Sequence, residues 1–209
     1  MIRAHRQHEY GNRLQGHWIC GLWAGLRCLV VAALACMLGS APVLRAQQAK
    51  PNEYQVKAAY LYNFGRFVAW PAKVAPVKNG SFTICVLGQD PFGPALNATL
   101  AGETINGENV AARRIPSPED AVNCRILFIS SSESDRLQQI LATLGDASVL
   151  TVSDLPEFSR RGGMVQFTME GDRVRFEVNL ATAEHAGLSL SSELLKVATS
   201  VRKNSQAGD

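Results

Sequence analysis

The spacing of apolar residues changes several times between residues 53 and 202, and each change predicts a new element. Apolar side chains three, four and seven residues apart are typical of helices that bury one face. That spacing predicts four helices, at 56–67, 94–101, 137–144 and 191–201. Alternating or short continuous apolar runs bounded by turn residues predict six strands, at 81–87, 110–115, 125–129, 149–152, 164–169 and 173–178.

The order of these elements predicts a single α/β domain. Buried parallel strands need crossover connections of helical length, and the alternation of strands and helices along the chain supplies them. The strands at 125–129 and 149–152 are continuously apolar, as expected for strands buried on both faces. The last two strands are joined by the short turn 170–172 and predict an antiparallel hairpin. We therefore predict a central mixed, largely parallel sheet flanked by helices, with a C-terminal antiparallel hairpin.

The second strand of this hairpin has two unlike faces. Three apolar residues alternate with three charged ones along this strand. The apolar residues are Val174, Phe176 and Val178, and the charged ones are Arg173, Arg175 and Glu177. Because successive side chains of a strand point to opposite sides, the two sets lie on opposite faces. We expect the charged face to be solvated or reserved for a partner.

The first 46 residues have the profile of an export signal. Four arginines precede an uncharged run of about ten residues, LVVAALACML at 29–38, which suits the hydrophobic region of a signal peptide. A membrane span needs about 20 apolar residues, and Arg27 interrupts the longer stretch 19–38. We expect cleavage after Ala46, with Ala41 as the other candidate. An uncleaved anchor and a lipid attachment at Cys36 are the weaker alternatives.

Removing this signal changes the charge of the chain. Residues 1–46 hold five arginines and one glutamate, a net charge of +4 against +3 for the whole chain, so residues 47–209 carry about −1. The basic balance belongs to the signal, and the electrostatic footprint of a nucleic-acid-binding protein is missing. With 46% hydrophobic and 19% charged residues in the whole sequence, the remaining 163 residues fit one globular domain.

The sequence of this domain offers few of the residues that a catalytic site or a metal site would need. The histidine that remains, His185, has no nucleophile at a fixed spacing, which favours a surface histidine at a helix C-terminus over a catalytic triad. One histidine and two cysteines do not make a metal site, and the carboxylates show no calcium-loop spacing. The motif FSRRGG at 158–163 predicts a connecting loop that needs positive φ, with a backbone anion nest as the alternative. We expect no enzyme activity, no cofactor and no metal.

The two cysteines that remain, Cys85 and Cys124, lie beside the apolar runs TICVL and CRILFI. An oxidising compartment favours pairing of an even set of cysteines, and a bond between them would tie two elements of one core together. Two buried free thiols are the alternative. No CxxC spacing exists, which argues against a thioredoxin-type redox catalyst.

Five segments in order resemble the YfiR family of small periplasmic proteins. They are EYQVKAAYLYNFGRFVAWP, FTICVLGQDPFG, CRILFIS, LTVSDLPEFSRRGGMVQF and VRFEVNLATAEHAGLSLSSELLKVA, which together extend from residue 53 to about 202. The resemblance implies a non-enzymatic periplasmic regulator that binds the sensor part of an inner-membrane diguanylate cyclase and represses cyclic-di-GMP synthesis. Relatives also accompany membrane histidine kinases or outer-membrane proteins. The resemblance further implies a disulfide between Cys85 and Cys124, whereas the second cysteine pair of some relatives has no counterpart after Cys124.

We expect the partner to bind at Glu177, Asn179 and the AEHAGLSL segment that follows them, especially Leu188. Such a surface places charge beside exposed apolar area, as interfaces do. The alternative places Glu177 in a pair with a neighbouring strand and Leu188 in the core. The competing function is a periplasmic small-ligand sensor or carrier, in which the aromatic stripe of the first helix lines a pocket. A third possible function is that of an exported hydrolase that uses His185. The sequence leaves the oligomeric state open, a homodimer included.

Overall fold

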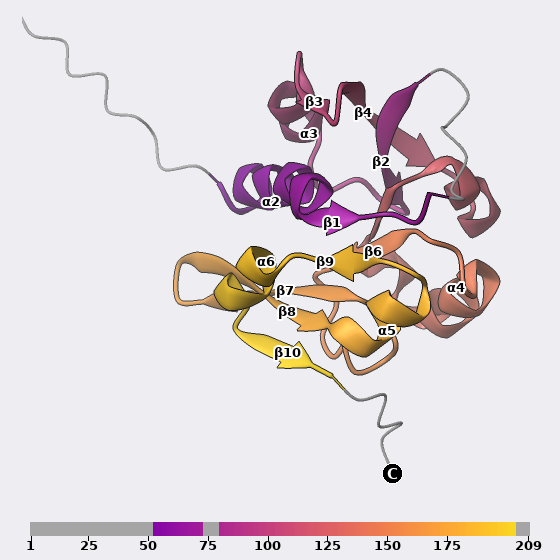
Figure 1. Ribbon diagram of the computed structural model, residues 1–209. Helices are drawn as coiled ribbons and strands as arrows, with labels where there is room; N and C mark the ends of the chain where they lie inside the picture. The colour runs from indigo at the N-terminus through magenta and orange to yellow at the C-terminus, as the bar shows by residue number, and fades with distance from the viewer. Residues whose placement is uncertain (1–51, 73–79, 204–209) are drawn as a thin grey trace, which may run out of the picture. The chain divides into compact units, whose positions relative to one another are not determined.

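The computed structural model describes residues 52–72 and 80–203 (Figure 1). The expected signal peptide, residues 1–46, lies outside the described residues. In the part of the chain that is described, no helix combines the length and apolarity that a membrane span requires. The helices are α2 (Glu53–Phe67), α3 (Pro94–Leu100), η1 (Pro118–Asn123), η2 (Ser131–Arg136), α4 (Leu137–Leu144), α5 (Leu180–His185) and α6 (Ser192–Val197). The strands are β1 (Val68–Ala69), β2 (Ser81–Leu87), β3 (Thr104–Ile105), β4 (Glu108–Ile115), β5 (Ile126–Ile129), β6 (Leu150–Ser153), β7 (Val165–Glu170), β8 (Arg173–Asn179), β9 (Ser189–Leu190) and β10 (Ser200–Arg202).

An eight-stranded sheet forms the centre of the domain, in the order β10-β8-β7-β6-β5-β2-β4-β3. Neighbouring strands are parallel except for two antiparallel pairs, β7 with β8 and β3 with β4. A separate two-stranded sheet joins β1 and β9. The predicted mixed, largely parallel sheet with a C-terminal antiparallel hairpin is therefore confirmed.

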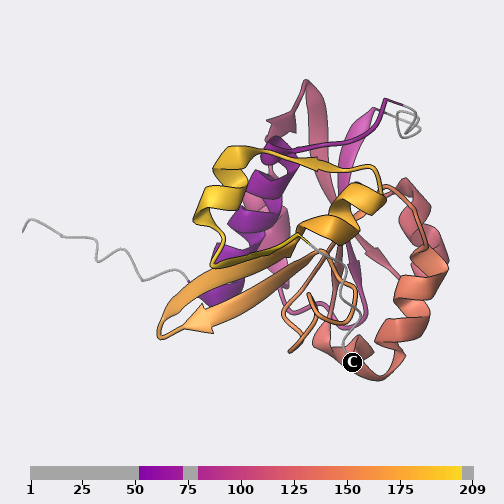
Figure 2. The same ribbon diagram turned by 60° about the horizontal axis from the view of Figure 1, so that its bottom comes forward.

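The central strands are buried because apolar layers cover both faces of the sheet. On one face, Phe64 of α2 packs in a cluster with Phe128 of β5 and Phe176 of β8. On the other, Ile140 of α4 packs in a cluster with Leu127 of β5. Figure 2 shows α2 and α4 on opposite sides of these strands. Alternate residues of β5 thus enter two different clusters, and every residue of that strand is buried, as its continuous apolar run predicts.

Helix α2 begins at a reciprocal cap. The side chain of Asn52 accepts a hydrogen bond from the Gln55 backbone N–H at 2.8 Å, and the Gln55 side chain accepts one from the Asn52 N–H at 2.8 Å. The face that this helix buries is rotated from the predicted stripe. Val56, Tyr60 and Phe67 are only partly buried, and the fully buried positions are Lys57, Ala58, Leu61, Phe64 and Gly65.

The predicted last helix, 191–201, is wrong in its second half. Helix α6 ends at Val197, after which the backbone becomes extended and residues 200–202 form β10 at the edge of the sheet. Both the backbone N–H and the hydroxyl of Thr199 donate to the Phe176 carbonyl, at 2.9 and 3.0 Å. Pairing with β8 therefore overrides a local sequence whose apolar spacing is helical.

Candidate partner-binding surface

The hairpin and the edge strand beside it have one buried face and one open face. Val174, Phe176 and Val178 are at most 7% exposed, so the predicted apolar face is confirmed. The side chains between them, with their neighbours on β7 and β10, are partly or fully exposed. We call this set the polar sheet face: Gln166, Thr168, Glu170, Arg173, Arg175, Glu177, Ser200 and Arg202. Glu170 pairs with Arg175 at 3.3 Å within it.

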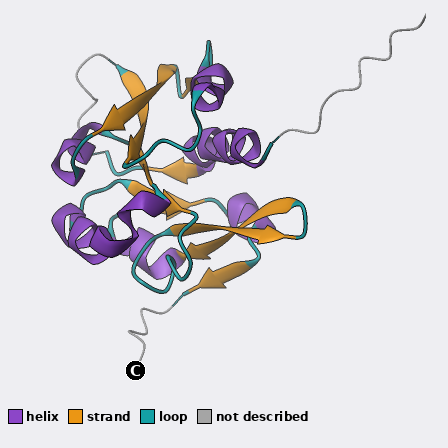
Figure 3. Cartoon of the chain, turned by 180° about the vertical axis from the view of Figure 1, so that it is seen from behind, coloured by secondary structure: helices purple, strands orange, loops and turns teal. Residues whose placement is uncertain are grey.

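A groove of about 620 Å³ lies between the first half of α2 and the hairpin. Its apolar lining consists of Val56 and Tyr60 from the helix and Met169 and Val174 from the hairpin. The remaining lining residues are polar: Asn52, Glu53, Asp172, Arg173 and Arg175. Met169 is 47% exposed, and the turn of the hairpin stands clear of the helices in two views (Figure 2, Figure 3). An apolar concavity edged by charge is the anatomy of a protein interface. We call it the hairpin groove.

A buried lysine fixes the helix wall of this groove. The Lys57 side chain is 3% exposed, and its Nζ lies 2.6 Å from Asp154 Oδ2 and 2.5 Å from Glu53 Oε1. The same nitrogen lies 4.5 Å from the ring centroid of Tyr54, whose hydroxyl donates to Asp154 Oδ2 at 3.1 Å. Burial, and next the Asp154 carboxylate, raises the pKa of Tyr54 to about 12. Because Asp154 follows β6, the cluster ties α2 to the carboxyl end of the sheet.

The predicted contact residues lie in three different settings. Leu188 is 2% exposed and packs in the core, which was the alternative for this residue. Asn179 is 8% exposed; its side chain caps α5 by accepting from the Thr182 N–H at 3.2 Å and donates to the Ser159 carbonyl at 2.8 Å. Glu177 is partly exposed on the polar sheet face and accepts a hydrogen bond from Ser159 Oγ at 3.2 Å. Of the three, Glu177 alone presents its side chain at the surface, so direct contact with a partner stays a prediction for that residue.

The residues that were considered for catalysis and for anion binding lie at the end of a helix and in a connecting loop. His185 is 76% exposed at the end of α5, where Nε2 lies 3.1 Å from Asp146 Oδ1. Within residues 52–72 and 80–203, no three metal-ligating side chains converge. In the FSRRGG loop, Gly162 has a φ of +103° and Arg161 donates to the Ser134 carbonyl at 3.2 Å. The expectation of a connecting loop with positive φ is therefore confirmed.

Comparison with known families decides how this arrangement is classified. A family model described as YfiR/HmsC-like matches residues 54–199. That range includes α2 from its second residue, the strands through β8 and all of the hairpin groove except Asn52 and Glu53, and it is more than half of the chain. The chain belongs to the YfiR/HmsC-like family. The resemblance that five sequence segments indicated is thereby confirmed.

Two solved structures are similar to this YfiR/HmsC-like chain at low sequence identity. A conserved domain protein from Vibrio cholerae has a TM-score of 0.50 at 9% identity; the match covers 72% of this chain and 60% of that protein. An ABC domain in complex with L-Trp from Streptococcus pneumoniae has a TM-score of 0.44 at 11% identity, covering 61% of this chain and 57% of that one. The chain thus spans about 60% of the length of the Vibrio protein, and that likeness concerns the fold alone.

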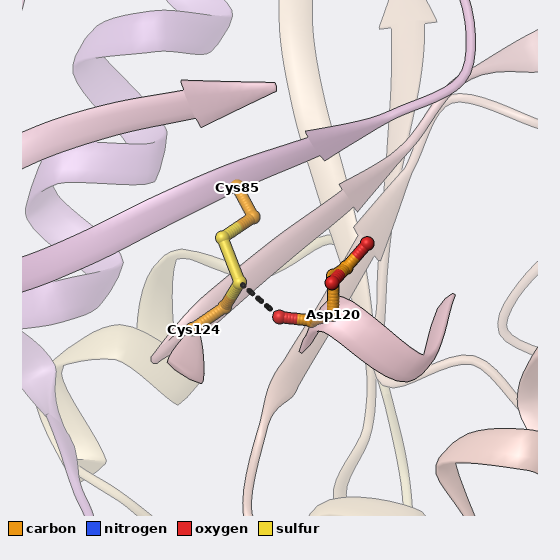
Figure 4. Close-up of a disulfide and its surroundings, with 3 residues drawn as sticks. All are labelled: Cys85, Asp120 and Cys124. Carbon is orange, nitrogen blue, oxygen red and sulfur yellow. Dashed lines mark hydrogen bonds between the residues drawn. A yellow bond between two sulfur atoms is a disulfide. The ribbon is translucent and has the colours of Figure 1, made fainter. Parts of the chain in front are cut away.

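The disulfide that the family resemblance implied is present. Cys85 of β2 and Cys124, which follows η1, are joined across 39 residues of sequence (Figure 4). The two residues are 0% and 4% exposed, and the backbone carbonyl of Asp120 lies 3.9 Å from the Cys124 sulfur. The bond therefore attaches the end of η1 to β2 inside the α4 side of the core.

Sequence reasoning missed the hairpin groove. Its helix wall and its hairpin wall lie more than 100 residues apart in the chain, so no local motif records their proximity. Met169 belongs to the apolar set of β7 by alternation, which predicts burial. Its position one residue before the end of that strand was the available signal, because side chains near a hairpin turn often extend beyond the core.

Proposed function

We propose that this YfiR/HmsC-like protein is a periplasmic regulator that binds and represses the sensor domain of an inner-membrane signalling enzyme. The enzyme class is a diguanylate cyclase of the cyclic-di-GMP pathway, with a histidine kinase as the other class. The family match over residues 54–199 carries the proposal. The export signal expected at residues 1–46 supports the periplasmic location.

The open surfaces of the hairpin support the same function. The hairpin groove offers an apolar concavity to one side chain of a partner, and charges of both signs surround it. Interfaces commonly combine a desolvated apolar anchor with a polar rim that sets orientation. We place the periplasmic domain of the signalling enzyme on this groove and on the adjoining polar sheet face. Glu177 then contributes to the edge of the interface.

The proposal is tested by deleting the gene in its own host and measuring cellular cyclic-di-GMP. The nucleotide should rise in the deletion strain and return to the wild-type level on complementation with the intact chain. Complementation with Met169→Ser should fail in part, because loss of an interface anchor costs about 1 to 2 kcal/mol, or about a 5- to 30-fold weaker affinity. Glu177→Lys should also weaken repression while leaving the domain folded.

The matched control is Val122→Ser. Val122 is 75% exposed on η1 and, like Met169, is an exposed large apolar residue, but it is not part of the hairpin groove. It should complement fully. Unchanged cyclic-di-GMP in the deletion strain would refute the cyclase assignment. Equal complementation by the Met169 and Val122 variants would remove the hairpin groove from the interface.

A further inference from the structure

The walls of the hairpin groove are open to an incoming side chain. Met169 is 47% exposed and Arg173 is exposed, while Val56 and Tyr60 are partly exposed. The volume of about 620 Å³ leaves room for a large side chain. The chemistry of the accessible walls therefore decides which kind of side chain the groove takes.

The helix wall of the groove is the outer end of an aromatic cluster. The ring centroid of Tyr60 lies 5.5 to 6.0 Å from those of three phenylalanines, Phe64, Phe167 and Phe176. The phenylalanines are buried, whereas Tyr60 is partly exposed and lines the groove. Aromatic side chains favour neighbouring rings at about 4.5 to 7 Å, and the thioether of a methionine such as Met169 also makes favourable contacts with rings. A ring in the groove would extend this cluster by one member.

The charges that line the groove sum to zero. Two acidic residues, Glu53 and Asp172, and two arginines, Arg173 and Arg175, are part of the lining. Glu53 already has a cation at 2.5 Å, the Nζ of Lys57. A charged occupant would add an uncompensated charge to this balanced set, and a neutral occupant would not. Charge complementarity therefore favours an uncharged side chain.

The arginine at the start of β8 separates aromatic from aliphatic occupants. Within residues 52–72 and 80–203, Arg173 forms no ion pair. An aliphatic side chain beside its guanidinium would displace water and offer no electrostatic replacement. The face of an aromatic ring carries partial negative charge and attracts a cation within about 6 Å. A neutral aromatic ring thus suits both the apolar lining and this cation.

Given the proposed function, which places the partner on this groove, we propose that the partner inserts a neutral aromatic side chain, a phenylalanine, tyrosine or tryptophan. The ring packs against Tyr60 and the thioether of Met169, with its face toward the guanidinium of Arg173. Aromatic residues are common among the few side chains that dominate the energy of an interface. The sensor domain of the partner therefore carries an exposed aromatic residue as its anchor.

The test measures binding of two probes to the purified full-length chain, with no partner present. N-acetyl-phenylalaninamide represents the anchor. N-acetyl-cyclohexylalaninamide is its control, because its saturated ring has a similar shape and no π-electrons. NMR follows isotope-labelled methionine methyl groups, and the Met169 signal is assigned by its absence from Met169→Leu. The buried Met164, which is 4% exposed, is the internal reference.

The phenylalanine probe should move the Met169 methyl signal upfield and saturate, because an aromatic ring current shields protons above its face. We expect a dissociation constant of about 1 to 10 mM for a ligand of this size. The cyclohexyl probe should bind about 3- to 10-fold more weakly, because it lacks the aromatic and cation–π contacts. No saturable shift with the phenylalanine probe, or equal binding of the two probes, would overturn the proposal.

Three variants assign the preference to the groove. Arg173→Gln, at an exposed position, should weaken binding of the phenylalanine probe about 2- to 5-fold and leave the cyclohexyl probe unchanged. Tyr60→Leu removes the ring of the helix wall and should weaken the phenylalanine probe about 2- to 10-fold. Arg113→Gln removes an exposed arginine of β4 outside the groove and should bind both probes like wild type. An unchanged ratio of the two dissociation constants in both groove variants would overturn the assignment.

Failure of the aromatic anchor is distinguishable from failure of the proposed function. The segment of the membrane partner that crosslinks to position 169 should contain an aromatic residue, and its replacement by leucine should weaken binding about 10-fold. A crosslinked segment with no aromatic residue would overturn the anchor and leave the regulatory role intact. Aromatic-selective probe binding by a protein that represses no membrane enzyme would refute the proposed function and the anchor with it.

Discussion

Removing the carboxylate of Asp154 tests how the helix wall of the hairpin groove is held. In Asp154→Asn, Lys57 Nζ keeps Glu53 as its anionic partner, but the Glu53 side chain is 41% exposed whereas that of Asp154 is 15% exposed. The Lys57 side chain is 3% exposed, so its ammonium group has little access to water. The variant therefore leaves a buried charge poorly compensated, and the stability of the domain should fall.

The size of this effect follows from burial. Removing one partner of a buried ion pair costs about 3 to 5 kcal/mol when the other charge is left alone. Since Glu53 remains as a partly screened partner, we expect about 2 to 3 kcal/mol. For a domain of this size that loss lowers the thermal midpoint by about 4 to 12 °C. Lys57→Met combined with Asp154→Leu removes both charges and should recover most of the loss.

Urea denaturation followed by circular dichroism measures the free energy of unfolding of each variant. Arg160→Gln is the control, because it breaks the pair between Arg160 and Glu157, whose side chains are 61% and 57% exposed. That exposed pair should contribute about 1 kcal/mol or less. An Asp154→Asn protein within about 0.5 kcal/mol of wild type, the range of an ordinary surface substitution, would refute the reasoning.

Three further predictions concern the disulfide, a tight turn and a tyrosine. Replacing Cys85 and Cys124 together by alanine opens the 39-residue loop and should lower the unfolding free energy by about 4 kcal/mol in the chain-entropy model, as urea denaturation would show. Gly163→Ala places a methyl carbon 2.1 Å from the Phe158 ring, so overpacking should cost about 1 to 3 kcal/mol in the same assay. The pKa of Tyr54 is raised from 10.0 to about 12. The protonated hydroxyl therefore contributes its full stabilisation below pH 10, and this contribution is lost as the pH rises from 10 toward 12. Between these pH values the unfolding free energy of Tyr54→Phe should fall less steeply than that of wild type.

Each of these predictions has its own contrary outcome. Wild-type protein that has been reduced while unfolded should match the double alanine variant, and equal stability of the oxidised and reduced chains would contradict the loop argument. The Gly163→Ala cost should shrink in a Phe158→Leu background, and the same cost in both backgrounds would exclude the ring as its cause. If the unfolding free energies of wild type and Tyr54→Phe fall in parallel above pH 10, the raised pKa of Tyr54 does not contribute to stability as proposed.

The central strands were predictable because their signal is local. A short continuous apolar run such as Ile126–Ile129 is too short for a helix and fits a strand covered on both faces. The alternation in Arg173–Asn179 likewise sets both the hairpin and the face that stays open. In these segments the propensity of the sequence and the demands of the fold agree.

The elements that sequence could not predict depend on distant contacts. Residues 200–202 have helical spacing but pair with β8, because an open sheet edge offers backbone partners that a helix end does not. Lys57 is charged, which predicts exposure, yet Asp154 nearly 100 residues away compensates it inside the fold. The same limit applies to function. Leu188 looked like a contact residue by its place in the segment, and its burial is visible only when the core is assembled.

The most direct test of the account is photo-crosslinking from the hairpin groove in the native envelope. Met169 is replaced by the photoreactive residue p-benzoylphenylalanine, a second strain carries the same residue at Val122, and the crosslinked products are identified by mass spectrometry. The account predicts a crosslink from position 169, and none from position 122, to an inner-membrane diguanylate cyclase or histidine kinase with a periplasmic domain. Folded protein at normal abundance with no product at position 169, or with the same product at both positions, would contradict it.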